Sequence, residues 1–241
     1  MNSPGPCWAP GFSPHGHWNQ VPARETQQYL RQQFRRWGRP ETVRVDNGTP
    51  WGHWNDLPVA LALWLMGLGI EVYWNDPRCP QQNAKVERSQ GTGKRWAEPD
   101  RCTDVAELQR HLDEVDQIQR ECYPAVGELS RLAGFPDLRH SGRDYSRAWE
   151  RAHWSLARVA NYLKEFVVPR RVRPSGSVSV YEQDYYVGAA YRGQTMLVQF
   201  DPSDRTWVIC DAKGQQLRRH ATREITRERI VKLQMELRHD R

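Results

Sequence analysis

The chain has 241 residues, of which 38% are hydrophobic and 27% charged, and it includes 11 Trp, 9 Tyr and 5 Phe. That length allows one catalytic-size domain and a small second domain, and the aromatic content excludes a disordered chain. The formal net charge is +6, and most of the 35 cationic side chains are Arg, which suits contacts to phosphate. On composition alone, a nucleic-acid partner and a merely basic surface are equal alternatives.

The five cysteines argue against a zinc finger or a disulfide framework, because they form no CxxC pair and no histidine pair stands at zinc-ligand spacing beside them. Reduced thiols, as in a cytoplasmic protein, fit this pattern better. No apolar run approaches the roughly 20 residues that a membrane span needs, since Pro58 and Gly67 interrupt the longest one. We expect a cytoplasmic protein with no membrane partner.

The first half of the chain alternates between predicted helices and predicted strands. A Pro- and Gly-rich start with a strand near residues 12–21 precedes the first amphipathic helix, which Gly38 and Pro40 end. In chain order, we expect a helix at 23–37, a strand at 42–46, a helix at 57–68, a strand at 70–74, a loop at 75–82, a helix at 83–96 and a helix from Thr103 onward. This alternation is typical of an α/β sheet.

The second half changes from helical patterns to short strand patterns near Pro169. Residues 124–142 hold several Pro and Gly and predict a linker, and residues 147–166 predict a further helix. Turn signals, one of them at 182–184, separate strand-like runs at 177–180, 185–187, 196–200, 207–210 and 215–219. Five such strands spaced about ten residues apart favour a small β-barrel, and a charged helix is expected from Arg223.

Asp46 is the first candidate for chemistry. It ends the predicted strand at 42–46, and Asn47-Gly48 forms a turn signal directly after it. An Asp in this place projects its carboxylate at the carboxyl edge of a sheet, where open α/β sheets bind ligands. Taken alone, the sequence is better explained by an ordinary turn Asp.

Glu87 is the second candidate, in the segment that begins Pro80-Gln81-Gln82. On a helix, Asn83, Glu87, Gln90 and Lys94 would share one face, because they are spaced by four, three and four residues. Such a face offers one carboxylate, two amides and one cation to a single partner. The alternative is a solvated helix Glu between charged neighbours.

Together the two segments resemble a known family. "VDNGTPWG" followed by "PQQNAKVERSQGTGKRW" is similar to the second and third acidic motifs of the retroviral-type integrase core, and more closely to those of bacterial insertion-sequence transposases. Asp46 and Glu87 are 41 positions apart, slightly more than the family spacing. The expected barrel after Pro169 resembles the C-terminal barrel of transposases of the Mu and insertion-sequence type.

The resemblance implies an RNase H-like α/β core that cuts and joins DNA at transposon ends with two Mg²⁺ or Mn²⁺ ions about 4 Å apart. In the family, three carboxylates hold these ions, and Asp46 and Glu87 match the second and the third. Asn83, Lys85 and Arg88 would contact the DNA end or brace the helix, and Lys94 lies on the same face. Arg170, Arg171 and Arg173, ahead of the barrel, would contact phosphate unless they are a solvated run.

One family feature is absent from the sequence. The family's first Asp precedes the Arg-rich helix, whereas Asp46 is the first Asp of this chain and only Glu25 and Glu41 come before it. Residues 12–22 look like the family's third strand. We therefore expect a core that is truncated at its N-terminus, lacking the first strands and the first catalytic Asp.

The expected organisation follows from these segments. It comprises a remnant strand or coil at 1–22, a partial integrase catalytic core at 23–123, a linker with a helix at 124–168, a β-barrel at 169–222 and a charged C-terminal helix at 223–241. The expected partners are double-stranded DNA, as transposon ends and target, and other protomers, because two ends must be paired. As a bacterial transposase, the protein would lie on the nucleoid when bound to DNA.

Three functional alternatives stay open at this stage. The chain is either a transposase-type protein whose catalytic site is incomplete, or a non-catalytic DNA-binding remnant or competitor of an intact transposase. An interaction module with no DNA role is a third possibility. The side chains of Arg31, Arg35 and Arg36 fit either a solvated helix face or DNA contact, while Trp51, Trp64 and other tryptophans are expected to pack rather than stack on bases.

Overall fold

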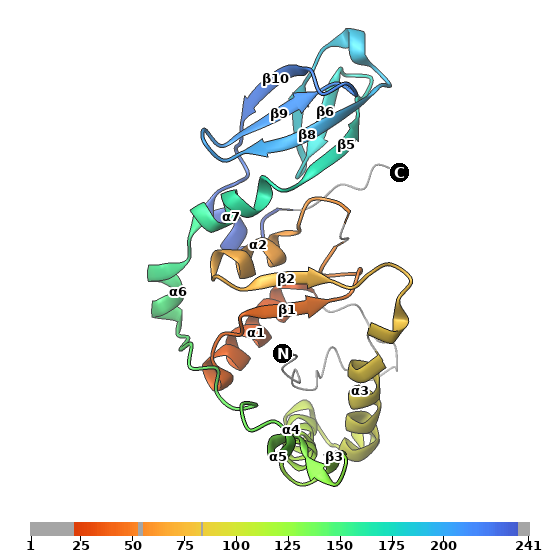
Figure 1. Cartoon of the computed structure of the whole chain (residues 1–241), viewed down its shortest axis with the longest axis vertical. Coiled ribbons are helices and arrows are strands. Elements are labelled where there is room, and N and C mark those ends of the chain that lie inside the picture. Colours follow the sequence, from red (N-terminus) through yellow and green to blue (C-terminus); the bar gives the residue numbers. More distant parts are fainter. Residues whose placement is uncertain (1–21, 53–54, 83, 236–241) are drawn as a thin grey trace. The chain divides into compact units, whose positions relative to one another are not determined.

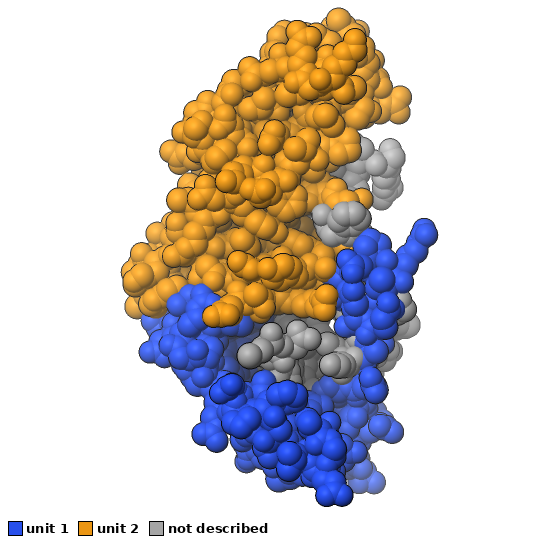
Figure 2. Space-filling model, in the orientation of Figure 1, with its two compact units in different colours: residues 1–40, 75–146 blue, residues 41–74, 147–241 orange. Residues whose placement is uncertain are grey.

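The computed structural model describes residues 22–52, 55–82 and 84–235, and these form a mixed α/β protein with several small sheets (Figure 1). The chain divides into two compact units, each made of two stretches of sequence (Figure 2). The first unit comprises 1–40 and 75–146, and the second comprises 41–74 and 147–241. The strand expected near residues 12–21 lies outside the described residues.

The first unit is mainly helical. Its elements are α1 (Ala23–Trp37), η1 (Pro80–Gln82), α3 (Ala84–Ala97), η2 (Pro99–Arg101), α4 (Val105–Glu121), the hairpin strands β3 (Pro124–Val126) and β4 (Leu129–Ser130), and α5 (Arg131–Gly134). Helices α3 and α4 pack around a small apolar core of Ala97, Leu108, Leu112 and Val115. The predicted helices at 23–37 and 83–96 are confirmed within one residue, although Gly91 and Gly93 lower the helix propensity of the latter.

Local chemistry sets the ends of these helices. At the N-terminus of α4, the Asp104 carboxylate accepts a hydrogen bond from the Glu107 amide at 2.8 Å, and the Glu107 carboxylate accepts one from the Thr103 amide at 2.6 Å. These bonds satisfy amides that lack an intrahelical partner. Helix α1 ends at Gly38, whose φ of 76° suits glycine. A Cβ there would lie 2.2 Å from Ser141 Oγ, so this position also needs a residue without a side chain.

The second unit combines a parallel strand pair with an antiparallel β-rich region. Its elements are β1 (Thr42–Val45), α2 (Ala60–Gly67), β2 (Glu71–Trp74), α6 (Arg147–His153), α7 (Leu156–Leu163), β5 (Val167–Arg171), β6 (Ser177–Val180), β7 (Gln183–Tyr186), η3 (Ala189–Tyr191), β8 (Thr195–Asp201), β9 (Thr206–Cys210), β10 (Gln216–Ala221) and α8 (Arg227–Val231). Strands β1 and β2 pair in parallel, with Val45 opposite Trp74, and α2 connects them. The result is a β–α–β arrangement, as the alternation in the sequence predicts.

Helix α2 is buried almost all round, which explains its uninterrupted apolar sequence. It packs against α7 and α8. Trp64 is fully buried and donates from Nε1 to the buried Glu150 carboxylate at 3.1 Å. Trp154 in turn donates to the Trp64 carbonyl at 3.0 Å. These two bonds satisfy the indole groups of the core and fix the α6–α7 segment against α2.

The β-rich region holds a four-stranded antiparallel sheet in the order β10-β9-β8-β5 and a separate β6–β7 hairpin. Its core includes Phe200 and Trp207, whose rings meet edge to face at 5.3 Å. The fully buried Glu224 carboxylate accepts hydrogen bonds from Tyr185 Oη and Trp207 Nε1, both at 2.6 Å. Burial and the bond to Glu224 raise the pKa of Tyr185, so this hydroxyl stays a donor at neutral pH.

The structure corrects four details of the predicted elements. The linker expected at 124–142 contains the β3–β4 hairpin and α5, and the helix expected at 147–166 is broken at 154–155 into α6 and α7. After the break, Ser155 caps α7, its hydroxyl accepting from the Arg158 amide at 3.4 Å. The turn expected at 182–184 falls earlier, at Tyr181 and Glu182, which both have positive φ. Strand β5 was not predicted, and it is an edge strand, where Pro169 is tolerated.

Three further boundaries differ slightly or stay predictions. Helix α2 begins at Ala60 rather than residue 57, after Pro58, and the helix of the charged tail is short. The predicted domain boundaries stay predictions; residues 23–40 and 75–123 of the expected core fall in one unit and 41–74 in the other.

None of the helices in the described part of the chain is long and apolar enough to cross a membrane.

Candidate functional site

Asp46 lies immediately after β1, in the second unit, and its side chain is exposed. Because β1 and β2 are parallel, Asp46 lies at the carboxyl edge of this strand pair, as the sequence predicts. An exposed carboxylate at such an edge can accept hydrogen bonds or bind a cation.

The loop after Asp46 is held by several bonds to its own backbone and to β2. The Trp51 and Gly52 amides donate to the Gly48 carbonyl at 2.6 and 3.0 Å, which closes the turn that Asn47-Gly48 predicts. Trp74, the last residue of β2, donates from Nε1 to the Trp51 carbonyl at 3.1 Å. Trp51 is buried and therefore packs, as expected, and the loop anchors the chain beside Asp46.

Glu87 lies on α3, in the first unit, and is exposed together with its neighbour Arg88. The helix brings Glu87, Gln90 and Lys94 onto one face, as predicted from their spacing. Arg88 donates from Nε to the Ala84 carbonyl at 3.2 Å, which holds its guanidinium along the helix. Lys85 is part of α3, and Asn83 lies outside the described residues.

The three arginines ahead of the barrel have different surroundings. Arg170 forms an ion pair with Asp56, and the two side chains are only 15% and 22% exposed. Arg173 pairs with Asp184 at 2.9 Å, whereas Arg171 is exposed. Arg170 therefore links β5 to the segment before α2, a structural role that the sequence did not indicate because Asp56 is 114 residues away. DNA contact by these arginines stays a prediction, with Arg171 the most accessible.

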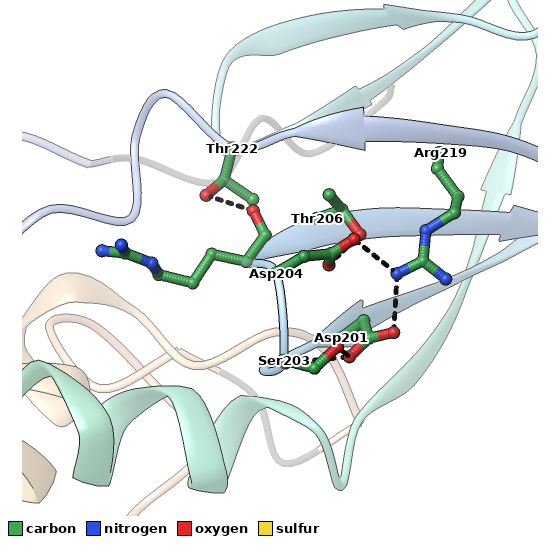
Figure 3. Close-up of polar contacts among 7 residues, drawn as sticks. Asp201, Ser203, Asp204, Thr206, Arg219 and Thr222 are labelled. Carbon is green, nitrogen blue, oxygen red and sulfur yellow. Dashed lines mark hydrogen bonds and ion pairs between the residues drawn. The ribbon is translucent and has the colours of Figure 1, made fainter.

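A network of charged and hydroxyl side chains joins β8, β9 and β10 (Figure 3). The Arg219 guanidinium donates to Asp201 at 2.7 Å and to Asp204 at 2.9 Å, and Thr206 Oγ1 donates to Asp204 at 2.7 Å. Hydrogen bonds from Ser203, and then from Arg219, lower the pKa of Asp201 to about 2. The sequence did not single out this network, because its members are spread over three strands and the β8–β9 turn.

Among residues 22–52, 55–82 and 84–235, no group of three or more His, Cys, Asp or Glu side chains is arranged to hold a metal ion. Only Asp46 and Glu87 match the acidic motifs of the family, and the resemblance implies three carboxylates. These two residues do not by themselves fit a two-metal site.

No family model matches the chain.

Proposed function

We propose that this chain is a DNA-binding protein of the integrase and transposase class, which acts in DNA transposition on transposon ends and target DNA. The observation that carries the proposal is the exposed Asp46, directly after β1 at the carboxyl edge of the parallel β1–β2 pair. Ligands of α/β sheets bind at this edge. The exposed Glu87 and Arg88 on α3 support the proposal, because they supply the second motif in the expected order.

We further propose that the α/β part is an incomplete RNase H-like core and that the β-rich region is a small barrel. The β1–α2–β2 arrangement supports the first assignment. The six antiparallel strands between Val167 and Ala221 support the second. Pairing of two transposon ends would require a homo-oligomer in the active assembly.

Asp46 and Glu87 would be the ligands of Mg²⁺ or Mn²⁺ that this chain contributes, and the ions would stabilise the charges at the phosphate that is cut. Because the two carboxylates do not fit a complete two-metal site, we propose that the catalytic site of this chain is incomplete. DNA binding is then the activity that this chain has by itself.

The role of the two carboxylates can be tested through their charge. A carboxylate beside bound DNA repels phosphate when no divalent ion is present, by about 1 kcal/mol at 4 Å in water. Asp46→Asn and Glu87→Gln should therefore each tighten the binding of a labelled 30-base-pair duplex in EDTA by about fivefold. Glu128→Gln, at the exposed turn between β3 and β4, removes the same charge from another site and should leave the affinity unchanged.

Unchanged affinity in both carboxylate variants would contradict the placement of Asp46 and Glu87 at a DNA-binding surface. A second measurement, nicking of supercoiled plasmid with Mg²⁺, tests whether the site is incomplete. We expect no nicking by the wild-type chain. Nicking that Asp46→Asn abolishes would show a working site and overturn the proposed incompleteness.

A further inference from the structure

Helix α1 carries a stripe of arginines along its outer face. Arg24, Arg31 and Arg35 are spaced by seven and four residues. At about 100° per residue, they fall within about 40° of one another around the helix axis. Arg24 and Arg35 are exposed, and Arg31 is half-buried. Gln28 and Gln32, both exposed, lie next to the stripe, so this face presents hydrogen-bond donors along its length.

A second face of α1 is buried and comprises Thr26, Gln27, Leu30 and Phe34. Leu30 is 7% exposed and Phe34 is 4% exposed, and the Phe34 ring meets Tyr145 edge to face at 5.7 Å. At about 100° per residue, Leu30 lies about 100–140° from the three arginines around the helix axis, and Phe34 lies about 60–100° from them. Burial of this face therefore fixes the rotation of the helix and leaves Arg24 and Arg35 exposed.

Helix α1 itself has few acidic residues. Glu25 is the one acidic residue of α1. Arg31 donates to the Gln27 side chain at 2.6 Å, which orients its guanidinium. Arg24 and Arg35 have no ion-pair partner among the residues that the structure describes. Arg36, off the stripe, differs because it pairs with Asp113 at 3.5 Å and lies over the Trp37 ring.

We propose that the outer face of α1 binds the phosphate backbone of double-stranded DNA, a contact separate from Asp46, Glu87 and the arginines of β5. This inference rests on the proposed DNA-binding function and names a surface for it. The stripe from Arg24 to Arg35 is about 16 Å long at 1.5 Å per residue. Duplex DNA carries one charge per about 1.7 Å of its axis, so several phosphates lie within that length.

The guanidinium groups favour the phosphate backbone of DNA over a partner with fewer negative charges. Arg binds phosphate oxygens in a bidentate manner, and each neutralised phosphate releases condensed counterions. The stripe contains no apolar side chain that a protein partner could bury. It therefore suits contacts that fix the position of the duplex without reading its sequence.

The test is the salt dependence of DNA affinity, measured by fluorescence anisotropy with the full chain and a labelled 30-base-pair duplex of random sequence. The Arg24→Gln/Arg35→Gln variant should bind more weakly at every salt concentration. Its slope of log affinity against log salt should be shallower by about 2, because each lost phosphate contact removes about 0.9. Gln has nearly the helix propensity of Arg, so α1 should persist, which far-UV circular dichroism would check.

Two matched variants distinguish a specific contact of the α1 face from a general effect of the protein's positive charge. Arg24→Lys/Arg35→Lys keeps both charges and should keep most of the wild-type slope. Arg139→Gln/Arg192→Gln removes the same charge from two exposed positions outside α1 and should change the slope little. An equal decrease of the slope in the Arg139→Gln/Arg192→Gln control, or an unchanged slope in the Arg24→Gln/Arg35→Gln variant, would overturn the inference.

The outcomes also distinguish this inference from the proposed function. Salt-dependent binding by the wild-type chain that the α1 variant retains would overturn the α1 contact alone. Absence of salt-dependent binding in the wild-type chain would overturn the proposed function itself. If the α1 variant loses affinity for poly-glutamate but not for the duplex, the stripe binds an acidic protein instead.

Discussion

At the scale of single residues, Asp201 shows how a local network sets a charge. Ser203 and Arg219 both donate to its carboxylate, and Arg219 is shared with Asp204 (Figure 3). These donors stabilise the ionised form, which is why the pKa falls to about 2. The network joins the β8–β9 turn to β10, so its protonation state bears on the stability of the sheet.

We predict that Asp201 makes the stability of the second unit depend on pH in the acidic range. Its folded pKa lies below the ordinary value of 3.8, so its contribution to stability is present above about pH 4 and is lost as the pH falls through about 2. Wild type should be more stable than Asp201→Asn at about pH 5, and the difference in free energy of unfolding should shrink toward pH 2. Urea unfolding over this pH range is the measurement.

Ser203→Ala provides the control for the cause of this shift. It removes the hydrogen bond that lowers the pKa most, so NMR titration should show a higher pKa for Asp201 in this variant. A difference between wild type and Asp201→Asn that stays constant from pH 5 to pH 2 would contradict the assignment.

At the scale of elements, the packing of α2 depends on a glycine at its last turn. A Cβ at Gly67 would lie 2.1 Å from the ring of Trp154, which is 4% exposed and donates to the Trp64 carbonyl. The indole cannot move away without giving up that hydrogen bond. Gly67 therefore lets α2 and the α6–α7 segment approach closely.

We predict opposite effects for alanine at two helical glycines. Gly67→Ala should lower the free energy of unfolding by about 1–3 kcal/mol, because it overpacks the contact with Trp154. A Cβ at Gly91 in α3 would have no atom within 4 Å among the described residues outside its own helix backbone, so Gly91→Ala should raise the free energy of unfolding by up to about 1 kcal/mol, because alanine is the better helix former. Urea unfolding followed by circular dichroism would test both, and destabilisation of equal size in the two variants would refute the packing argument.

The elements also show where sequence patterns suffice. The amphipathic pattern of α1 and the apolar run of α2 predict both helices, because the first pattern reports burial of one face and the second reports burial all round. Local patterns also predict the positions of the two candidate residues. Asp46 directly follows a strand, and Glu87 lies on a helix, as expected from the residues around them. Strand β5 escaped prediction because Pro169 and the arginines beside it resemble a loop, and only its pairing with β8 makes it a strand.

Long-range contacts explain the other misses. The ion pair of Arg170 with Asp56 and the buried Glu224 between Tyr185 and Trp207 join residues far apart in the sequence. No local pattern reveals which cation meets which anion, so the sequence alone suggested DNA contact for Arg170. The break between α6 and α7 likewise depends on Trp154 docking on α2, which the helical pattern cannot show.

At the scale of the whole molecule, the net charge of +6 and the excess of Arg point to a polyanionic partner. The exposed Arg24 and Arg35 lie in one unit and the exposed Arg171 in the other, so each unit has cations available to phosphate. Binding that uses such contacts releases counterions from DNA, and its strength must therefore depend on salt.

The salt dependence of DNA binding by the unmodified chain tests the central claim most directly. With a labelled 30-base-pair duplex, we predict that log affinity falls linearly with log salt. Six or more phosphate contacts would weaken binding by about 10³-fold or more between about 50 and 200 mM salt. An affinity that does not change with salt, or no binding at low salt, would contradict a DNA-binding function.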